Sequence, residues 1–162
     1  MEYNNTHVRR QDRLLTEEEA LRLLEQGEYG VLSLTTPEGE AYGIPVNFVH
    51  DGHGHIYVHC APEGRKLRCI SHNPQVSFCI VGATKVISHK FTTAYESVVL
   101  ACHADTGLTA EERMQALELL LRKYSPSDWE TGRRYADKSF HRTAVIRLTV
   151  RQFSGKCKRV TP

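Results

Sequence analysis

The chain has 162 residues, a length that fits one hydrophobic core and therefore one domain. Hydrophobic residues make up 40% and charged residues 25% of the sequence, which excludes a disordered chain and a membrane-embedded one. The formal net charge is only +2 and the basic residues are scattered, so the sequence argues against nucleic-acid binding.

Cysteine usage and the polar start of the chain bear on its location. The five cysteines are an odd number without CxxC spacing, which favours reduced thiols and a cytoplasmic protein. No apolar segment follows the N-terminal residues, so we expect neither a signal peptide nor contact with a membrane. We expect a single domain over residues 1–162, with residues 1–13 as a flexible N-terminal arm.

The first expected helix covers residues 16–26. Thr16 and Glu19 have the spacing of a capping box, in which each side chain bonds to the backbone of the other residue. Apolar residues then recur at helical spacing, and Gly27 ends the segment.

Three expected strands follow the helix. Residues 29–35 and 41–49 alternate β-branched or apolar residues with polar ones around a short turn, which predicts a hairpin. Residues 55–60 alternate in the same way after a glycine-rich turn. We therefore expect three antiparallel strands in succession.

The rest of the chain mixes helices and strands. We expect helices at 63–71 and 108–124 and strands at 76–81, 91–103 and 143–153. The fold class is thus mainly β with flanking helices, built on about six antiparallel strands. Because closure removes exposed strand edges, we expect the sheet to form a closed or nearly closed barrel.

A glycine followed by two cations suggests an anion site. Gly64 precedes Arg65 and Lys66, which fall on the first turn of the expected helix. Unpaired backbone N–H groups at a helix start attract phosphate, and an arginine binds it through two parallel hydrogen bonds. The alternative is a solvated basic turn.

The strand segment at 42–47 contains Gly43 and Pro45, which central strands avoid. A flat heterocycle could approach this backbone closely, with polar groups free to bond its edge. The alternative is an edge strand with a kink.

Several histidines and aromatic residues admit more than one interpretation. The histidines lack the ligand framework of a zinc site, so we expect no metal. They are His50, His53, His55, His59 and His72. His59 and Cys60 are adjacent on a strand and point to opposite faces, so they do not form a nucleophile–base pair.

The aromatic residues near the end of the long expected helix also have two interpretations. Tyr124, Trp129 and Tyr135 flank a break at 125–127. They either cover a bound ring or pack in the core, and the sequence favours packing.

The order of several segments resembles a known family. YGIPVNFV, IYVHCAPEGRKL, NPQVSFCIVG, KFTTAYESVV and HRTAVIRL are similar to the Nim-type 5-nitroimidazole-resistance branch of the pyridoxamine 5'-phosphate oxidase-like proteins. The resemblance covers nearly the whole chain and implies the FMN-binding split-barrel fold, with the flavin at the interface of a homodimer.

The resemblance also implies roles for individual residues. Arg65 and Lys66, on the turn with Gly64 and beside Cys60, would bind the flavin phosphate. His59 occupies a position that this branch associates with its active site. The residues implied to meet the edge of the isoalloxazine ring are Pro45, Val46 and Asn47, and Ser97 is implied to reach the cofactor across the dimer interface.

The activity implied is that of a flavin-dependent oxidoreductase that reduces small electron-poor acceptors such as nitroimidazoles. FMN is the expected cofactor, whereas relatives of this fold also bind FAD or heme. A heme-binding protein and a flavin-binding module without turnover are the alternatives.

Overall fold

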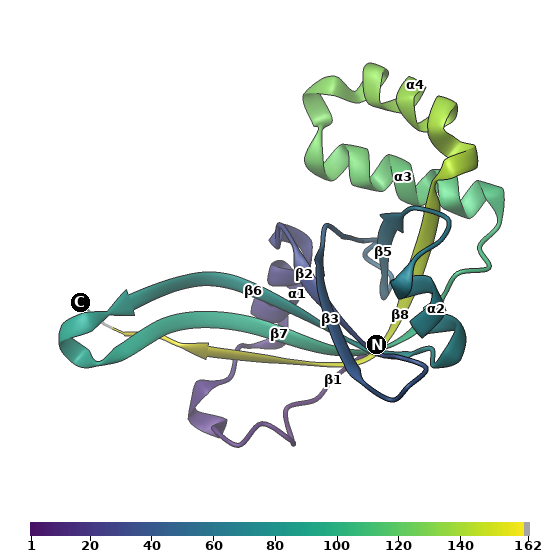
Figure 1. Cartoon of the computed structure of the whole chain (residues 1–162). Helices are drawn as coiled ribbons and strands as arrows, with labels where there is room; N and C mark the ends of the chain where they lie inside the picture. Colours follow the sequence, from purple (N-terminus) through teal and green to yellow (C-terminus); the bar gives the residue numbers. More distant parts are fainter. Residues whose placement is uncertain (161–162) are drawn as a thin grey trace.

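An eight-stranded, mainly antiparallel sheet organises the protein (Figure 1). The computed structural model describes residues 1–160. The strands are β1 (Glu2–Tyr3), β2 (Gly30–Thr35), β3 (Ala41–Val46), β4 (Val49–His50), β5 (His55–Cys60), β6 (Gln75–Ile87), β7 (Thr92–Asp105) and β8 (Ala144–Lys158). The helices are α1 (Glu17–Gln26), α2 (Arg65–His72), α3 (Ala110–Tyr124) and α4 (Trp129–Ser139). None of the helices in the described part of the chain is long and apolar enough to cross a membrane.

The sheet is open rather than closed. Its strand order is β3-β2-β6-β7-β8-β5-β4, with β1 parallel to β8, and β3 and β4 at its two ends do not pair. The sheet expected to be closed or nearly closed therefore does not close, whereas the expected mainly β fold with flanking helices is confirmed, with six strands of six residues or more. The long strands β6, β7 and β8 run beyond the body of the protein as an arm (Figure 1).

Helix α1 forms as its sequence predicts. The Thr16 side chain accepts from the Glu19 backbone N–H, and the Glu19 carboxylate accepts from the Thr16 N–H, which confirms the capping box. Gly27 ends the helix where a Cβ atom would lie 2.6 Å from the Ile80 side chain. Glycine is therefore required there by close packing against β6.

The third strand has a different partner from the one expected. β2 and β3 form the predicted hairpin, but β5 pairs with β4 and β8 rather than with β3. The chain changes direction at Phe48, which is fully buried with its ring edge-on to Phe78, 5.2 Å between centroids. Burial of this side chain turns the backbone away from β3 and splits the expected 41–49 strand in two.

Helix α4 was not expected from the sequence. It is polar, and its N-cap residue Asp128 makes no side-chain capping bond. Contacts with α3 hold it instead: Arg133 donates to Glu118 at 2.7 Å, and Gly132 leaves room for Leu121. The two helices form a hairpin that buries a second apolar cluster against β4, β5 and β8.

The N-terminal residues contact the sheet. Tyr3 pairs with Phe153 on β8, packs against its ring and donates a hydrogen bond to the Leu15 carbonyl. Residues 1–13 thus have defined contacts at their start, and the flexibility expected for them stays a prediction.

Candidate functional site

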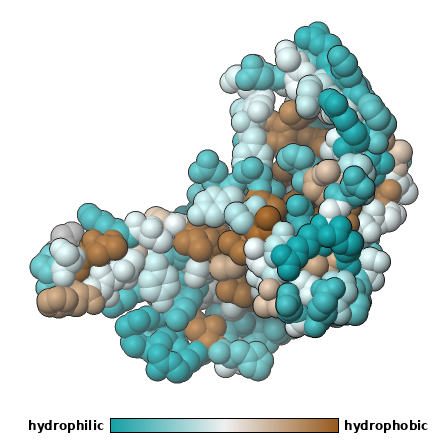
Figure 2. Space-filling model, viewed as in Figure 1, coloured by the Kyte–Doolittle hydropathy of each residue, from teal (hydrophilic) through white to brown (hydrophobic). Residues whose placement is uncertain are grey.

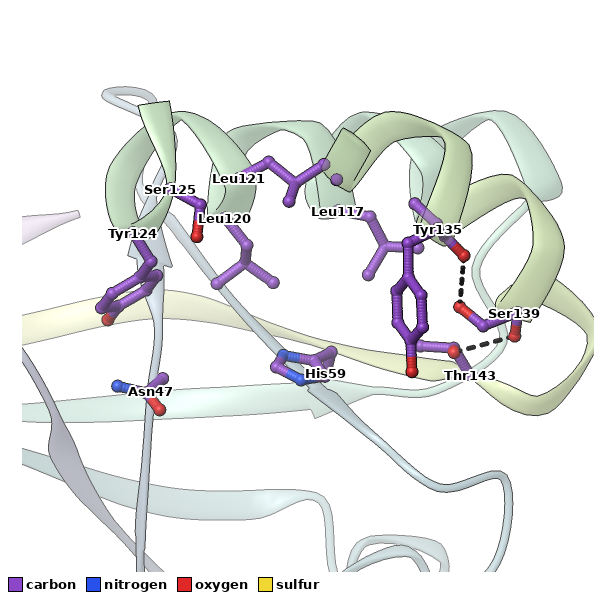
Figure 3. Close-up of a pocket in the computed structure, with 12 residues that line it drawn as sticks. Asn47, His59, Leu117, Leu120, Leu121, Tyr124, Ser125, Tyr135, Ser139 and Thr143 are labelled. Carbon is purple, nitrogen blue, oxygen red and sulfur yellow. Dashed lines mark hydrogen bonds between the residues drawn. The ribbon is translucent and has the colours of Figure 1, made fainter. Parts of the chain in front are cut away.

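A pocket of about 340 Å³ lies between the α3–α4 hairpin and the sheet (Figure 3). Leucines of α3 and residues of α4 form its roof, and residues from the ends of three strands form its floor. Figure 2 shows apolar surface where the hairpin faces the sheet. The lining residues are Asn47, His59, Leu117, Leu120, Leu121, Tyr124, Ser125, Gly132, Tyr135, Ala136, Ser139 and Thr143.

His59 is presented to this pocket by β5. Its neighbour across the ladder is Val145 of β8, whose side chain is buried, so the strand position is fixed. Protein atoms around the imidazole lower its pKa by desolvation, and the positive charge of Lys66 lowers it further. His59 is therefore held mainly as neutral imidazole near pH 7, and its ring makes no hydrogen bond within residues 1–160.

Asn47 reaches the same pocket from the end of β3, and a tyrosine fixes the segment around it. The Asn47 amide donates to the Glu28 carbonyl at 3.1 Å. The Tyr124 hydroxyl lies 2.7 Å from that carbonyl, accepts from the Phe48 N–H at 3.0 Å and lies 2.8 Å from the Phe48 carbonyl. No local sequence pattern indicates this role for Tyr124, since its partners are 76 and 96 residues away.

The aromatic residues after α3 do not share one role. Tyr124 anchors the end of α3, and Trp129 stacks on the Arg122 guanidinium at 4.4 Å. Tyr135 is 65% exposed and lines the pocket, so the prediction that it packs in the core was wrong. Because α4 places it over a cavity, its ring is available to a bound molecule.

The second part of the site is the start of α2. Gly64 is its N-cap residue, with φ of +145° and no atom within 4 Å of where a Cβ would lie. No side chain caps the helix, and its first turn carries no acidic residue. A cationic first turn without a cap is unfavourable for a helix on its own, because it opposes the helix dipole. A bound anion would remove that conflict.

The two cations of this turn point to different neighbours. Arg65 stacks on the Tyr42 ring at 4.3 Å and lies 3.9 Å from the Glu40 carboxylate. Lys66 is close enough to His59 and Cys60 to act on the pKa of both. Gly64, Lys66, His59 and Cys60 thus gather at one end of β5, and Arg65 extends from there toward β3.

Cys60 does not behave as a nucleophile. Burial raises the pKa of its thiol, and the charge of Lys66 only partly opposes this effect. The side chain packs against the main apolar core. As expected, it is a small packing residue rather than a thiolate.

Pro45 and Val46 lie on β3, which is an edge strand of the sheet. A free edge explains why a proline is tolerated, since it removes no ladder hydrogen bond that a neighbour requires. A Cβ on Gly43 would lie 3.6 Å from the Val31 side chain, an ordinary contact. Pro45 itself is exposed, so this part of the strand is accessible to an external partner.

Ser97 is not brought to this site within one chain. It lies on β7 opposite Val81 of β6 and Lys156 of β8. It is absent from the pocket lining and from the surroundings of α2. The role implied for Ser97 across a dimer interface stays a prediction.

The histidine-rich region does not converge on a metal. His55 Nδ1 pairs with the Asp51 carboxylate at 2.8 Å, whereas both ring nitrogens of His50 are buried without a partner. Burial accordingly lowers the pKa of His50. Among residues 1–160, no group of at least three His, Cys, Asp or Glu side chains is arranged to hold a metal ion.

Lys123 lies at the C-terminal end of α3, next to Tyr124, and its Nζ atom is buried. Its Nζ atom has no hydrogen-bond partner in the described residues and lies 3.8 Å from the centroid of the Phe48 ring. Desolvation lowers the pKa of Lys123 to about 8. A shift of this size corresponds to about 3 kcal/mol, whereas an ammonium–ring attraction is worth up to about 2 kcal/mol. Desolvation therefore outweighs the attraction, and the charged amine costs stability.

Replacing Lys123 by methionine is expected to stabilise the protein by about 1 to 2 kcal/mol at pH 7. The folded-state pKa lies below 10.5, so the cost is fully present below pH 8 and is relieved as the pH rises toward 10.5. The gain should therefore shrink by pH 10. Urea denaturation of both proteins at pH 7 and pH 10 measures it, with Lys138→Met on the exposed side of α4 as the control. A gain that is equal at the two pH values contradicts this account.

Comparison with known proteins places this geometry in a family. The pyridoxamine 5'-phosphate oxidase family profile matches residues 16–157. Curated proteins give no match.

Solved structures share the fold at low sequence identity. A proposed 5-nitroimidazole antibiotic resistance protein from Bacteroides thetaiotaomicron is 22% identical, with a TM-score of 0.76 over 90% of this chain and 86% of its own. An FAD-binding protein from Mesorhizobium loti is 19% identical, with a TM-score of 0.65 over 91% and 98%. A heme storage protein from Vibrio cholerae is 17% identical, with a TM-score of 0.64 over 87% and 93%. The chain has an open split-barrel sheet and a profile match over most of its length, and it belongs to the pyridoxamine 5'-phosphate oxidase family.

Proposed function

We propose that the protein is an FMN-dependent oxidoreductase that reduces small electron-poor acceptors, with nitroaromatic compounds such as nitroimidazoles as the model class. The observation that carries this proposal is the uncapped, doubly cationic start of α2 beside a neutral histidine that faces an uncharged pocket. Membership of a family with flavin-binding neighbours supports the choice of cofactor. The similarity to the Bacteroides protein supports the choice of acceptor.

The start of α2 fits a flavin phosphate. The Gly64 position is open, and the first N–H groups of the helix have no side-chain cap. A phosphate there would accept from backbone N–H groups and from Arg65 and Lys66. Cys60 and Gly64 would border the phosphate through backbone and packing contacts rather than through a thiolate.

The ring of the flavin is expected at the segment from Pro45 to Asn47. Pro45 lies on a free edge, and the Asn47 carbonyl oxygen is not used by the hydrogen bond that its amide makes to Glu28. Tyr124 holds this segment in place through the Phe48 backbone. The chain thus offers a rigid polar edge for a planar heterocycle.

When bound, the flavin supplies the electron transfer itself, taking a hydride from a reduced nicotinamide or a similar donor. A nitro group that accepts two electrons and two protons becomes a nitroso group and releases water. His59 would hold the acceptor and, in its imidazolium form, deliver one of these protons from its ring nitrogen. The surrounding apolar roof would keep bulk water away from the acceptor.

A reconstitution experiment tests the proposed function. The purified protein should carry a yellow cofactor whose released mass is that of FMN, and the anaerobically reduced protein should be reoxidised by a nitroimidazole. A heme spectrum would instead support the heme-binding alternative. A bound flavin that no donor reduces and no acceptor reoxidises would indicate a non-enzymatic flavin-binding module.

A homodimer is part of the proposal. Val81 and Val99 are 43% and 46% exposed, and they share one face of β6 and β7 with Cys79 and Ser97, their cross-strand partners. Exposed valines on a long uncovered arm are typical of a surface that a second copy buries. Ser97 lies within this face, which supports its contact with the cofactor of the partner.

Light scattering is expected to give twice the 18.4 kDa mass of the chain. Replacing Val81 and Val99 together by lysine should produce a monomer that binds flavin weakly, because like charges would then face each other across the two-fold axis. Exposed Val86, also on β6 but beyond the bulge, is the matched control position. A wild-type monomer that retains one flavin per chain refutes the dimer.

The five cysteines are free, which supports the further proposal of a cytoplasmic location.

A further inference from the structure

The pocket roofed by the α3–α4 hairpin carries no ionic side chain. Its lining contains no Asp, Glu, Lys or Arg. The titratable group on its floor, His59, has its pKa lowered by burial and by Lys66, so near pH 7 it is mainly neutral. A carboxylate or ammonium group that entered would exchange water for lining residues that offer it no counter-ion, which is unfavourable.

Several polar groups of the pocket are already used by the protein. The Ser139 hydroxyl donates to the Tyr135 carbonyl, and the Thr143 hydroxyl donates to the Ser139 carbonyl. The Tyr124 hydroxyl is likewise occupied by backbone groups. The groups that make no hydrogen bond within residues 1–160 are the imidazole of His59, the hydroxyls of Tyr135 and Ser125, and the side-chain oxygen of Asn47. The occupant therefore meets uncharged hydrogen-bonding groups, among them one ring nitrogen and one phenol.

The shape of the pocket limits the size of that occupant. Its volume of about 340 Å³ lies at the lower end of the range for ligand pockets, roughly 300 to 1,000 Å³. The ring of Tyr135 extends from α4 toward the level of His59 and Thr143 (Figure 3). Leu117 and Leu120 form an apolar wall on α3. A small flat ring would contact the leucines and the tyrosine at once.

We propose that this pocket binds the uncharged aromatic ring of the electron acceptor, and that Tyr135 determines specificity by contacting that ring. The proposal rests on the proposed function, because it assigns the acceptor of that reaction to this pocket. Acidic and cationic acceptors are excluded by the uncharged lining. Tyr135 supplies a ring to stack against and a hydroxyl to bond with, whereas His59 holds the polar end of the acceptor.

Calorimetric titration with two matched probes tests the inference. The probes are para-nitrobenzyl alcohol, which is uncharged, and para-nitrobenzoate, which carries a carboxylate on the same ring. The alcohol should bind the purified protein with or without added FMN, and the benzoate should bind at least about a hundredfold more weakly. Equal affinities for the two probes would overturn the proposal. So would loss of alcohol binding when FMN is added, since the pocket would then belong to the flavin.

Substitutions at Tyr135 give the second arm of the test. Tyr135→Ala should weaken binding of the alcohol about tenfold, because the stacked ring is lost, whereas Tyr135→Phe should retain most of it. Tyr135 is exposed, so neither change removes a core side chain. Tyr29→Ala, at a half-exposed tyrosine outside the pocket, should leave the affinity unchanged. Unchanged binding in Tyr135→Ala would refute the role of this residue.

The outcomes separate this inference from the proposed function. A protein that binds no flavin, yet discriminates between the probes through Tyr135, refutes the flavin reductase and retains the ring-binding pocket. A protein that binds flavin and reduces both probes equally well, independent of Tyr135, retains the reductase and refutes the pocket.

Discussion

Replacing Arg65 and Lys66 together by alanine is expected to weaken FMN binding by at least about a hundredfold, since each charge-assisted hydrogen bond contributes roughly 1.5 to 3 kcal/mol. The two side chains leave the first turn of α2, which contains no acidic residue and has no capping side chain. The loss should appear with FMN but not with riboflavin, which has the same ring without the phosphate. Fluorescence titration with both flavins measures the two affinities.

Arg68 provides a matched control for this prediction. It lies one turn further along α2 and is exposed, so Arg68→Ala removes one positive charge from the same helix outside its first turn. Its FMN affinity should stay near that of the wild type. An equal loss in Arg68→Ala, or an equal loss for riboflavin in the double variant, would show that net charge or folding is affected rather than a phosphate contact.

Replacing His59 by alanine is expected to slow the reoxidation of reduced flavin by a nitroimidazole by about a hundredfold, the lower end of what general acids contribute. Lys66 and the surrounding protein atoms lower the pKa of His59. The imidazolium form is therefore favoured only at acidic pH, and the wild-type rate should rise as the pH falls through the pKa of His59. Stopped-flow absorbance between pH 5 and pH 8 measures the rate and its pH dependence.

His53→Ala is the control for the His59 variant. His53 is an exposed histidine on the turn before β5 and takes no part in the pocket. It should change neither the rate nor the pH profile. If His59→Ala binds flavin normally and keeps both the wild-type rate and the wild-type pH profile, His59 is a binding or packing residue and not a proton donor.

The sequence predicts elements whose stabilising contacts are local. α1 follows from Thr16 and Glu19, which bond to each other's backbone within one turn. The β2–β3 hairpin follows from alternation and a short turn. In the site, the Gly64-Arg65-Lys66 pattern marks the start of α2 correctly, because a glycine N-cap and a helical periodicity are both visible in a few residues.

Elements and pairings that depend on distant contacts escape prediction. α4 depends on Arg133 reaching Glu118 of α3. The strand at 55–60 is predicted correctly, but its pairing with β8 is not, because β8 follows almost 90 residues later. The same limit applies to the site. Tyr124 and Tyr135 line the pocket because the α3–α4 hairpin lies over His59. No local sequence pattern predicts where a helix packs on the rest of the protein.

The α3–α4 hairpin is inserted between two strands that pair directly with each other. β7 ends at Asp105 and β8 begins at Ala144, yet Asp105 and Arg147 are register partners and an ion pair at 3.0 Å. The ends of the insertion are therefore held together by the ladder itself, and its length adds little to the entropy of closing the connection. Selection can consequently exchange or reshape the roof of the pocket while the sheet stays constant, so sequence diversity within this architecture should be concentrated between residues 106 and 143.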